Sequence, residues 1–294
     1  MKRNQNNELF HLPNLEMNLS QTGSSDVPPL EWTGERMVPE VCDNDTFLEH
    51  IYRYKFAIPF IIDKDVLDIA CGEGYGSAAM LSGGARSVVG VDIDADAVEH
   101  ARRKYNLQTR VGSAEEIPAA DDEFDVVVSF ETIEHVANPE RFVDECVRVC
   151  RPGGWVIIST PNKDVYLKDA TPNEYHLSEM TPEQFSSCLR SRFKSVNIFG
   201  QCQTKAPWWS TRVCSVTTGS PLLRLPGATR IRSMVRRFCA PCLFDGAREA
   251  YCKNPLDQIM RRDSLLSAPF NPYLVRRVNV DTETPCYLIA VARL

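Results

Sequence analysis

The chain has 294 residues, of which 43% are hydrophobic, and its 33 Lys and Arg against 39 Asp and Glu give a net charge of −6. This is the composition of a globular protein. No apolar run reaches the roughly 18 residues that a membrane-spanning helix needs, and the first twenty residues lack the apolar centre of a signal peptide. We therefore expect a cytoplasmic protein.

The charges are unevenly distributed along the chain. Residues 203–294 carry 14 Lys and Arg against 6 Asp and Glu, a net charge of +8, whereas residues 1–202 carry −14. A basic segment attracts phosphate groups, nucleic acid or an anionic membrane surface. The alternative is that its arginines solvate helices or pair with the acidic part, and the sequence leaves both interpretations open.

The eleven cysteines predict reduced thiols, since their number is odd and they are scattered. Cys239 and Cys242 in the sequence CAPC, together with Cys252, could hold zinc or take part in redox chemistry. A structural zinc site usually needs four ligands at regular spacing. No second pair matches, so we predict buried thiols here and no metal.

The elements follow in chain order after a polar stretch rich in Asn, Ser, Gln and Pro, which predicts a flexible arm over residues 1–28. Helical spacing of apolar residues predicts helices, and short apolar runs predict strands. Predicted helices cover residues 46–61, 75–84, 95–105, 139–150 and 181–193, and predicted strands cover residues 65–72, 87–94, 108–114, 124–130, 153–162, 195–201 and 286–294.

This alternation predicts a doubly wound α/β fold with a mostly parallel, seven-stranded sheet covered by helices on both faces. About 80 residues without a β pattern separate the last two strands, which is too long for a hairpin loop. We predict a mostly helical insertion or cap there. The predicted division is an arm over 1–28, a main domain over 29–204, the insertion over 205–285, and the last strand of the main sheet over 286–294.

The sequence VLDIACGEGYG joins the first predicted strand to a helix and contains Gly72, Gly74 and Gly76. Glycine lets the backbone turn tightly and approach a ligand. Asp92 ends the next strand about 20 residues on, where a carboxylate can accept hydrogen bonds from both hydroxyls of a ribose. The spacing differs from the G-x-G-x-x-G of dinucleotide sites, and Asp68 would repel a pyrophosphate but suit an ammonium. The loop therefore favours S-adenosylmethionine over a nicotinamide dinucleotide.

Five motifs in order, VLDIACGEGYG, VVGVDID, GSAEEIP, FDVVVSFETIEHV and CRPGGWVIISTPN, resemble the class I S-adenosylmethionine-dependent methyltransferases of the methyltransferase type 11 branch. The flanking sequences TGERMVPE, EHIYRYKFA and NEYHLSEMTPEQF resemble bacterial members linked to polysaccharide and glycoconjugate synthesis. The resemblance implies the Rossmann-like methyltransferase fold and S-adenosylmethionine as the cofactor.

For the methionine end of the cofactor, the resemblance implies five contacts. Gly72, Gly74 and Gly76 would wrap the methionine moiety, and Asp68 would support its ammonium. Phe130, after the fourth predicted strand, would line the sulfonium side.

For the adenosine end, the resemblance implies that Asp92 holds the ribose and that Ile93 packs on the adenine face. Many members have an acid, followed by a small residue, where this chain has Ser113 and Ala114. The polar contact to the adenine amino group would then be weaker or made through water, while the backbone contact at Ala114 would persist.

Glu131, Glu134 and His135 directly follow a predicted buried strand. A metal is disfavoured because the zinc-protease motifs have two histidines where ETIEH has one. Acids in a solvated first helical turn would explain Glu131 and Glu134. We predict His135 as a catalytic general base or substrate orienter, with packing or cofactor gating as the alternative. His176 is the second catalytic candidate, with a structural or solvated role as its alternative.

We therefore predict a methyltransferase that acts on an oxygen of a small molecule or glycan, with a sugar hydroxyl favoured. The alternatives are a quinone or aromatic-ring methyltransferase, a nicotinamide-dependent dehydrogenase and a non-catalytic S-adenosylmethionine-binding protein. The expected partner is a small-molecule or saccharide substrate. Nucleic acid is not expected, because SFET replaces the Pro-Pro turn of the DNA amino-group enzymes. The basic segment could cap the active site or contact a membrane surface.

Overall fold

The computed structural model describes residues 27–31, 36–39, 41–42, 44–165, 173, 175–201, 275–277 and 285–294. Its centre is one sheet of eight strands, which in chain order are β1 (Asp65–Ile69), β2 (Ser87–Asp92), β3 (Gln108–Val111), β4 (Phe124–Ser129), β5 (Cys150–Pro161), β6 (Ser195–Gln201), β7 (Val275–Arg277) and β8 (Tyr287–Arg293).

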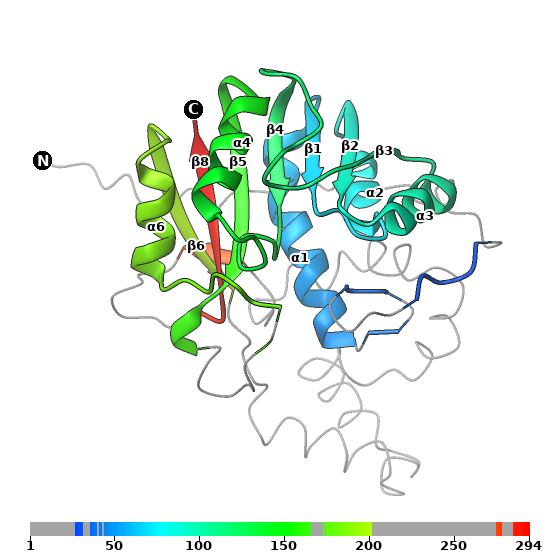
Figure 1. Ribbon diagram of the computed structural model, residues 1–294, viewed down its shortest axis with the longest axis horizontal. Helices are drawn as coiled ribbons and strands as arrows, with labels where there is room; N and C mark the ends of the chain where they lie inside the picture. The colour runs from blue at the N-terminus through cyan, green and yellow to red at the C-terminus, as the bar shows by residue number, and fades with distance from the viewer. Residues whose placement is uncertain are drawn as a thin grey trace, which may run out of the picture.

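The order of the strands across the sheet is β3-β2-β1-β4-β5-β8-β6-β7 (Figure 1). The strands from β3 to β5 in that order are parallel to one another. The C-terminal strand β8 lies between β5 and β6 and is antiparallel to both. The sheet is therefore mostly parallel, and its order reverses between β1 and β4, where ligands of open α/β sheets bind.

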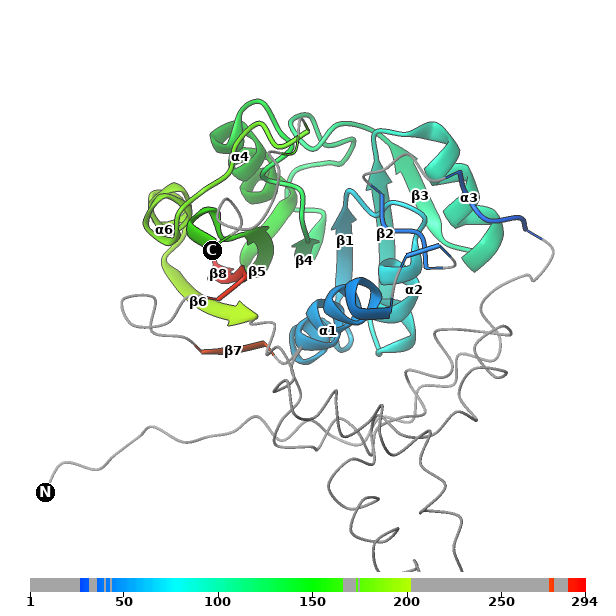
Figure 2. The same cartoon turned by 90° about the horizontal axis from the view of Figure 1, so that it is seen from below.

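Helices cover both faces of this sheet: α1 (Asn44–Ile61), α2 (Tyr75–Ser82), α3 (Ala95–Tyr105), α4 (Pro139–Val149) and α6 (Pro182–Arg190). Figure 2 shows α1 and α2 on one face and α4 and α6 on the other. No helix in the described ranges combines the length and apolarity needed to cross a membrane.

Each face of the sheet has its own hydrophobic core. Val66 packs with α1 and α2, whereas its neighbour Leu67 packs on the opposite face with Phe142 of α4 and Phe185 of α6. All four side chains are fully buried. Burial on both faces explains why the central strands are apolar at almost every position.

Side-chain caps fix where three of the helices begin. Asp94 accepts a hydrogen bond from the N–H of Asp96 at the start of α3, and Asn138 accepts one from the N–H of Arg141 in α4. Thr181 and Gln184 form a reciprocal capping box at the start of α6.

The predicted fold class is confirmed, and the sheet contains the seven predicted strands. It also has an additional short edge strand, β7, which pairs with β6 and lies within the 205–285 segment that the sequence predicts as a mostly helical insertion. The rest of that segment up to residue 284 lies outside the described residues. So do residues 1–26 of the predicted arm and all three cysteines of the CAPC hypothesis.

Candidate active site

A cleft of about 590 Å³ runs along the carboxyl ends of the parallel strands. This volume is in the range of small-molecule sites. Its walls come from the turns after β1, β2, β3 and β4, from α1, and from two segments distant in sequence. The residues that line it include Arg36, His50, Tyr54, Gly72, Tyr75, Asp92, Ile93, Ser113, Ala114, Phe130, Glu131, Glu134, His135, His176 and Tyr287.

The glycine loop after β1 faces the cleft with only one of its three glycines. Gly72 lies in the left-handed region, with φ 55°, and lines the cleft. A Cβ at Gly74 would lie 2.6 Å from the side chain of Ala101 in α3, and a Cβ at Gly76 would enter the ring of Tyr54. Gly74 and Gly76 therefore allow close packing behind the cleft, and their expected contact with a methionine moiety stays a prediction.

Glu73, inside the same loop, anchors it to α3 and was missed by the sequence interpretation. Its fully buried carboxylate accepts hydrogen bonds from Tyr105 Oη at 2.7 Å and Lys104 Nζ at 3.0 Å, and His100 Nε2 lies 3.2 Å away. Burial alone would raise the pKa of Glu73. The hydrogen bonds to its carboxylate and the positive charge of Lys104 outweigh the effect of burial, so the pKa of Glu73 is lowered. The sequence signal is a lone acid within a glycine loop, together with the basic last turn of α3 further along the chain.

Asp68 lies beneath the cleft and not on its surface. Its side chain is fully buried and accepts hydrogen bonds from Ser77 Oγ at 2.5 Å and from Tyr54 Oη at 3.5 Å. Burial raises the pKa of Asp68 to about 7, against the opposing effect of these two hydrogen bonds. Tyr54 lines the cleft and Asp68 does not, so the expected support of an ammonium by Asp68 stays a prediction.

The turn after β2 presents the groups expected for a ribose and an adenine. Asp92 accepts hydrogen bonds from the N–H of Gly72 at 2.8 Å and of Asp94 at 3.0 Å, which orient its carboxylate at the cleft. Ile93 is 75% exposed, unusual for so large an apolar side chain, and it lines the cleft beside Ser113 and Ala114. A carboxylate flanked by an uncovered apolar surface fits the adenosine part of S-adenosylmethionine.

Arg36 extends over the glycine loop from a segment that the sequence interpretation did not assign to the site. Its Nη2 is 2.7 Å from Asp94 Oδ2, and its side chain lies next to Gly72. Hydrogen bonding to Arg36, against some burial, lowers the pKa of Asp94.

The far end of the cleft is acidic and is strained at one residue. Glu131, after β4, has φ 54°, which costs a non-glycine residue about 1 to 2 kcal/mol. The serine of β5, Ser159, holds it in two ways: Ser159 Oγ accepts a hydrogen bond from the Glu131 N–H at 3.1 Å and donates one to Glu131 Oε1 at 2.6 Å. Strain that is maintained by its surroundings is typical of functional sites.

Arg53 lies behind Glu131 and is fully buried, although charged helix residues usually face solvent. Its Nη1 donates to Gln201 Oε1 at 2.8 Å, its Nε is 4.0 Å from Glu131 Oε1, and its guanidinium lies 4.5 Å from the ring centroid of Tyr287. Within the described residues, its Nε and Nη2 have no hydrogen-bond partner. Arg53 thus places a positive charge behind Glu131, and the sequence offered no sign that this helix position is buried.

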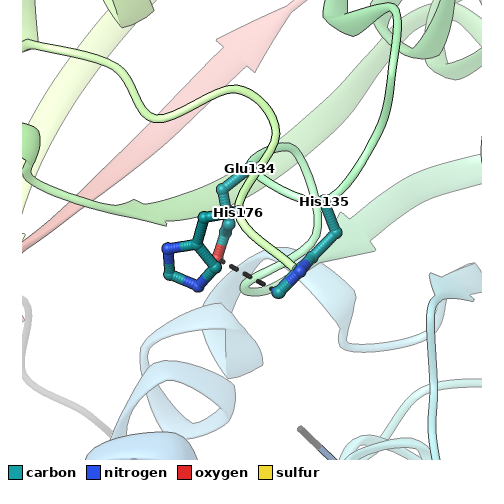
Figure 3. A group of neighbouring side chains, drawn as sticks. All are labelled: Glu134, His135 and His176. Atoms are coloured by element: carbon teal, nitrogen blue, oxygen red, sulfur yellow. Dashed lines mark ion pairs between the residues drawn. The ribbon is translucent and has the colours of Figure 1, made fainter. Parts of the chain in front are cut away.

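Glu134, His135 and His176 come together in the cleft (Figure 3). The backbone oxygen of Glu134 accepts hydrogen bonds from the N–H groups of Leu177 and Ser178 at 2.7 and 2.9 Å, which fix the two segments together. The rings of His135 and His176 are 4.9 Å apart and nearly perpendicular. Both predicted catalytic histidines therefore line one cleft.

Glu134 is the buried member of this group, with 1% of its surface exposed. Thr160 Oγ1 donates a hydrogen bond to its Oε2 at 3.0 Å. Burial, followed by the negative charge of Glu131, raises the pKa of Glu134 well above its usual value. The solvated first turn that would explain Glu131 and Glu134 is wrong for Glu134, because β5 and the 176–178 segment cover it.

Comparison with known proteins agrees with this geometry. A family model described as "Methyltransferase domain" matches residues 67–158. A protein of Mycolicibacterium smegmatis named "Probable S-adenosylmethionine-dependent methyltransferase" is 37% identical over 166 residues, covering 55% of this chain and 64% of that protein. A protein of the same description from Mycobacterium tuberculosis H37Rv is 36% identical over 185 residues, covering 61% of this chain and 67% of that protein. The chain thus spans about two thirds of the length of these relatives.

A "Ubiquinone biosynthesis O-methyltransferase" of Thiobacillus denitrificans is 39% identical over 122 residues, covering 39% of this chain and 52% of that protein. Among solved structures, a methyltransferase from Thermotoga maritima that the structure's description calls SAM-dependent has a TM-score of 0.51 and 15% identity, covering 85% of this chain and 93% of that one. At this identity the structural likeness supports the fold alone.

Proposed function

The chain belongs to the S-adenosylmethionine-dependent methyltransferases, and on that premise we propose that it transfers the methyl group to a hydroxyl oxygen of a small molecule or glycan, with a sugar hydroxyl as the acceptor. The observation that carries this proposal is the division of one cleft into two chemically different halves. One half has the Asp92 carboxylate and the exposed Ile93 side chain, and the other has Glu131, Glu134 and two histidines. Membership of this family excludes the dehydrogenase alternative.

In the donor half, Asp92 would hold the ribose, Ile93 and Ala114 would contact the adenine, and the loop at Gly72 would follow the methionine part. S-adenosylmethionine supplies an activated methyl group, so the protein has mainly to align the acceptor oxygen with it. Phe130 lines the cleft and makes an edge contact with Tyr54, with ring centroids 4.9 Å apart. These two rings would close the cleft around the sulfonium.

In the acceptor half, the hydroxyl would lie against Glu131, His135 and His176, since these side chains line the cleft. The histidines would orient the hydroxyl or receive its proton as the new carbon–oxygen bond forms. Carboxylates and imidazoles hydrogen-bond readily to a polyhydroxylated ring, which supports a saccharide. Glycoconjugate synthesis as the setting, and the cytoplasm as its place, belong to the same proposal.

The proposal is tested with one substitution in each half of the cleft. The protein is incubated with methyl-labelled S-adenosylmethionine and a fractionated extract, and the labelled product is identified. His135→Ala should then lower turnover by roughly 10²- to 10⁴-fold while the affinity for S-adenosylhomocysteine stays within about threefold. Asp92→Asn should act mainly on binding and weaken the affinity for S-adenosylhomocysteine by about tenfold or more.

Two results would contradict the proposal. Unchanged turnover in His135→Ala would show that His135 has no role in the reaction. Tight S-adenosylhomocysteine binding without label on any acceptor would favour a protein that binds the cofactor without catalysis.

A quinone or other aromatic acceptor is the second candidate. The ubiquinone-pathway relative favours it, and so do the aromatic rings of Tyr54, Tyr75 and Tyr287 in the cleft. Labelling of a catechol or polyprenyl phenol in preference to saccharides, in the same assay, would favour this acceptor class.

A further inference from the structure

The strongest unassigned feature of the cleft is the cluster of Glu134, His135 and His176. One carboxylate oxygen and one ring nitrogen from each histidine lie within 4.8 Å of one another (Figure 3). We propose that these three side chains bind a divalent first-row transition-metal cation, and that the acceptor hydroxyl docks on that cation. The role of the cation rests on the proposed function, whereas its binding does not.

The ligand types and their number fit such a cation. Two imidazoles and one carboxylate form the ligand set of several catalytic zinc sites, in which a remaining position is open to water or substrate. Ligands about 2.1 Å from a tetrahedral ion lie about 3.4 Å from one another. His135 Nε2 and Glu134 Oε1 are 3.9 Å apart, so this pair needs to close by only about 0.5 Å.

The hydrogen bonds around the histidines point to the same arrangement. His135 Nδ1 is 3.1 Å from the backbone oxygen of Tyr175, and His176 Nδ1 is 3.0 Å from Glu179 Oε1. Because both partners are acceptors, each neutral ring carries its proton on Nδ1 and has its lone pair on Nε2. A carbonyl or carboxylate that fixes a histidine tautomer in this way is typical of metal-binding histidines.

Backbone hydrogen bonds also hold the three metal-binding side chains together in the absence of a cation. Glu134 and His135 lie in the turn after β4, and the Leu177 and Ser178 N–H groups tie the His176 segment to Glu134. Glu134 is almost completely buried, and a buried carboxylate is stable only when paired. Arg53 already places a positive charge next to Glu131, so a bound cation would balance the charge of Glu134.

A cation at this position would assist the transfer by lowering the pKa of the acceptor hydroxyl, as metals do for bound water. The hydroxyl proton would pass to the Glu131 carboxylate. The oxygen would then form a bond to the methyl carbon while the carbon–sulfur bond breaks, its electron pair staying on sulfur in S-adenosylhomocysteine. His135 and His176 would act as metal ligands. They would thus orient the hydroxyl through the cation and would not receive its proton.

Binding is tested on the full chain after its metal has been removed with a chelator. Titration with Co²⁺, followed by its visible absorption, and with Zn²⁺, followed by calorimetry, should show one saturable site per chain. Mg²⁺ should bind far more weakly, because two of the three ligands are imidazoles. His176→Gln and Glu134→Gln should each weaken Co²⁺ binding by more than tenfold, and Glu179→Gln, which removes a partner of a ligand, by roughly tenfold.

His50→Gln is the matched control, since His50 lines the same cleft away from the cluster, with its ring against Tyr75 Oη at 2.9 Å. Its Co²⁺ affinity should equal that of the wild type. Affinity for S-adenosylhomocysteine is measured in every variant to show that each has folded. Absence of saturable Co²⁺ binding, or binding that His176→Gln leaves unchanged, would overturn the proposal.

The role of the cation is tested separately in the methyl-transfer assay. Chelation should lower transfer at least tenfold, and Zn²⁺ or Co²⁺ should restore it. Transfer that chelation leaves unchanged would overturn the role of the cation while the proposed function stands. Stoichiometric metal binding with no labelled acceptor would instead count against the proposed function and leave the site intact.

Discussion

The free energy of unfolding of the wild-type protein should decrease as the pH rises because of Asp68. Replacing Asp68 with Asn should abolish this decrease. Burial raises the pKa of Asp68 to about 7 in the folded protein, from its ordinary value of 3.8. The folded state therefore binds this proton more tightly than the unfolded state, so the free energy of unfolding falls between the two pKa values. The difference of about 3 pKa units corresponds to about 4 kcal/mol, of which about 2.5 kcal/mol falls between pH 5 and pH 8.

The assay is urea unfolding of the wild type and of Asp68→Asn at pH 5, 6, 7 and 8 in the absence of S-adenosylmethionine. The wild type should lose about 2.5 kcal/mol relative to the variant over this range. Asp63→Asn is the control, because Asp63 is an exposed acid, and its curve should stay parallel to that of the wild type. If the free energy of unfolding of Asp68→Asn varied with pH in parallel with that of the wild type, Asp68 would not be held protonated by burial. This result would refute the reasoning.

Two further substitutions test the packing behind the cleft and the adenine face. Gly76→Ala should lower the free energy of unfolding by about 1 to 3 kcal/mol, because the added Cβ enters the ring of Tyr54; an unchanged urea midpoint would contradict this. Ile93→Ala should weaken S-adenosylhomocysteine binding about fivefold to tenfold through lost apolar contact of about 1 kcal/mol, with little change in stability because Ile93 is 75% exposed. Ile62→Ala, at an exposed position outside the cleft, is its calorimetric control and should leave binding unaffected.

The sequence was sufficient for the elements that depend on local pattern. The alternation of apolar strands and amphipathic helices predicted the parallel sheet, and helical spacing predicted a helix over residues 181–193, where α6 lies. It also identified the strand ends that face the cleft, such as Asp92 and Phe130. These features follow from side-chain periodicity and from the common edge at which parallel strands end.

The sequence was less informative where two residues of the same type have different surroundings. Gly72, Gly74 and Gly76 look alike in the sequence, but only Gly72 lines the cleft, because the other two face Ala101 and Tyr54. Arg53 could not be distinguished from an exposed helix charge until strand β8 placed Tyr287 against it.

By itself, then, the sequence determined the fold class, the family and the strand ends that form the site, because each is encoded within a few neighbouring residues. Only the tertiary structure decided that His176 joins Glu134 and His135 across 40 intervening residues, and that Asp68 lies beneath the cleft. The physical reason is that burial and long-range hydrogen bonds depend on how the chain packs. The single histidine after β4 gave no indication in the sequence that the fold places a second histidine beside it.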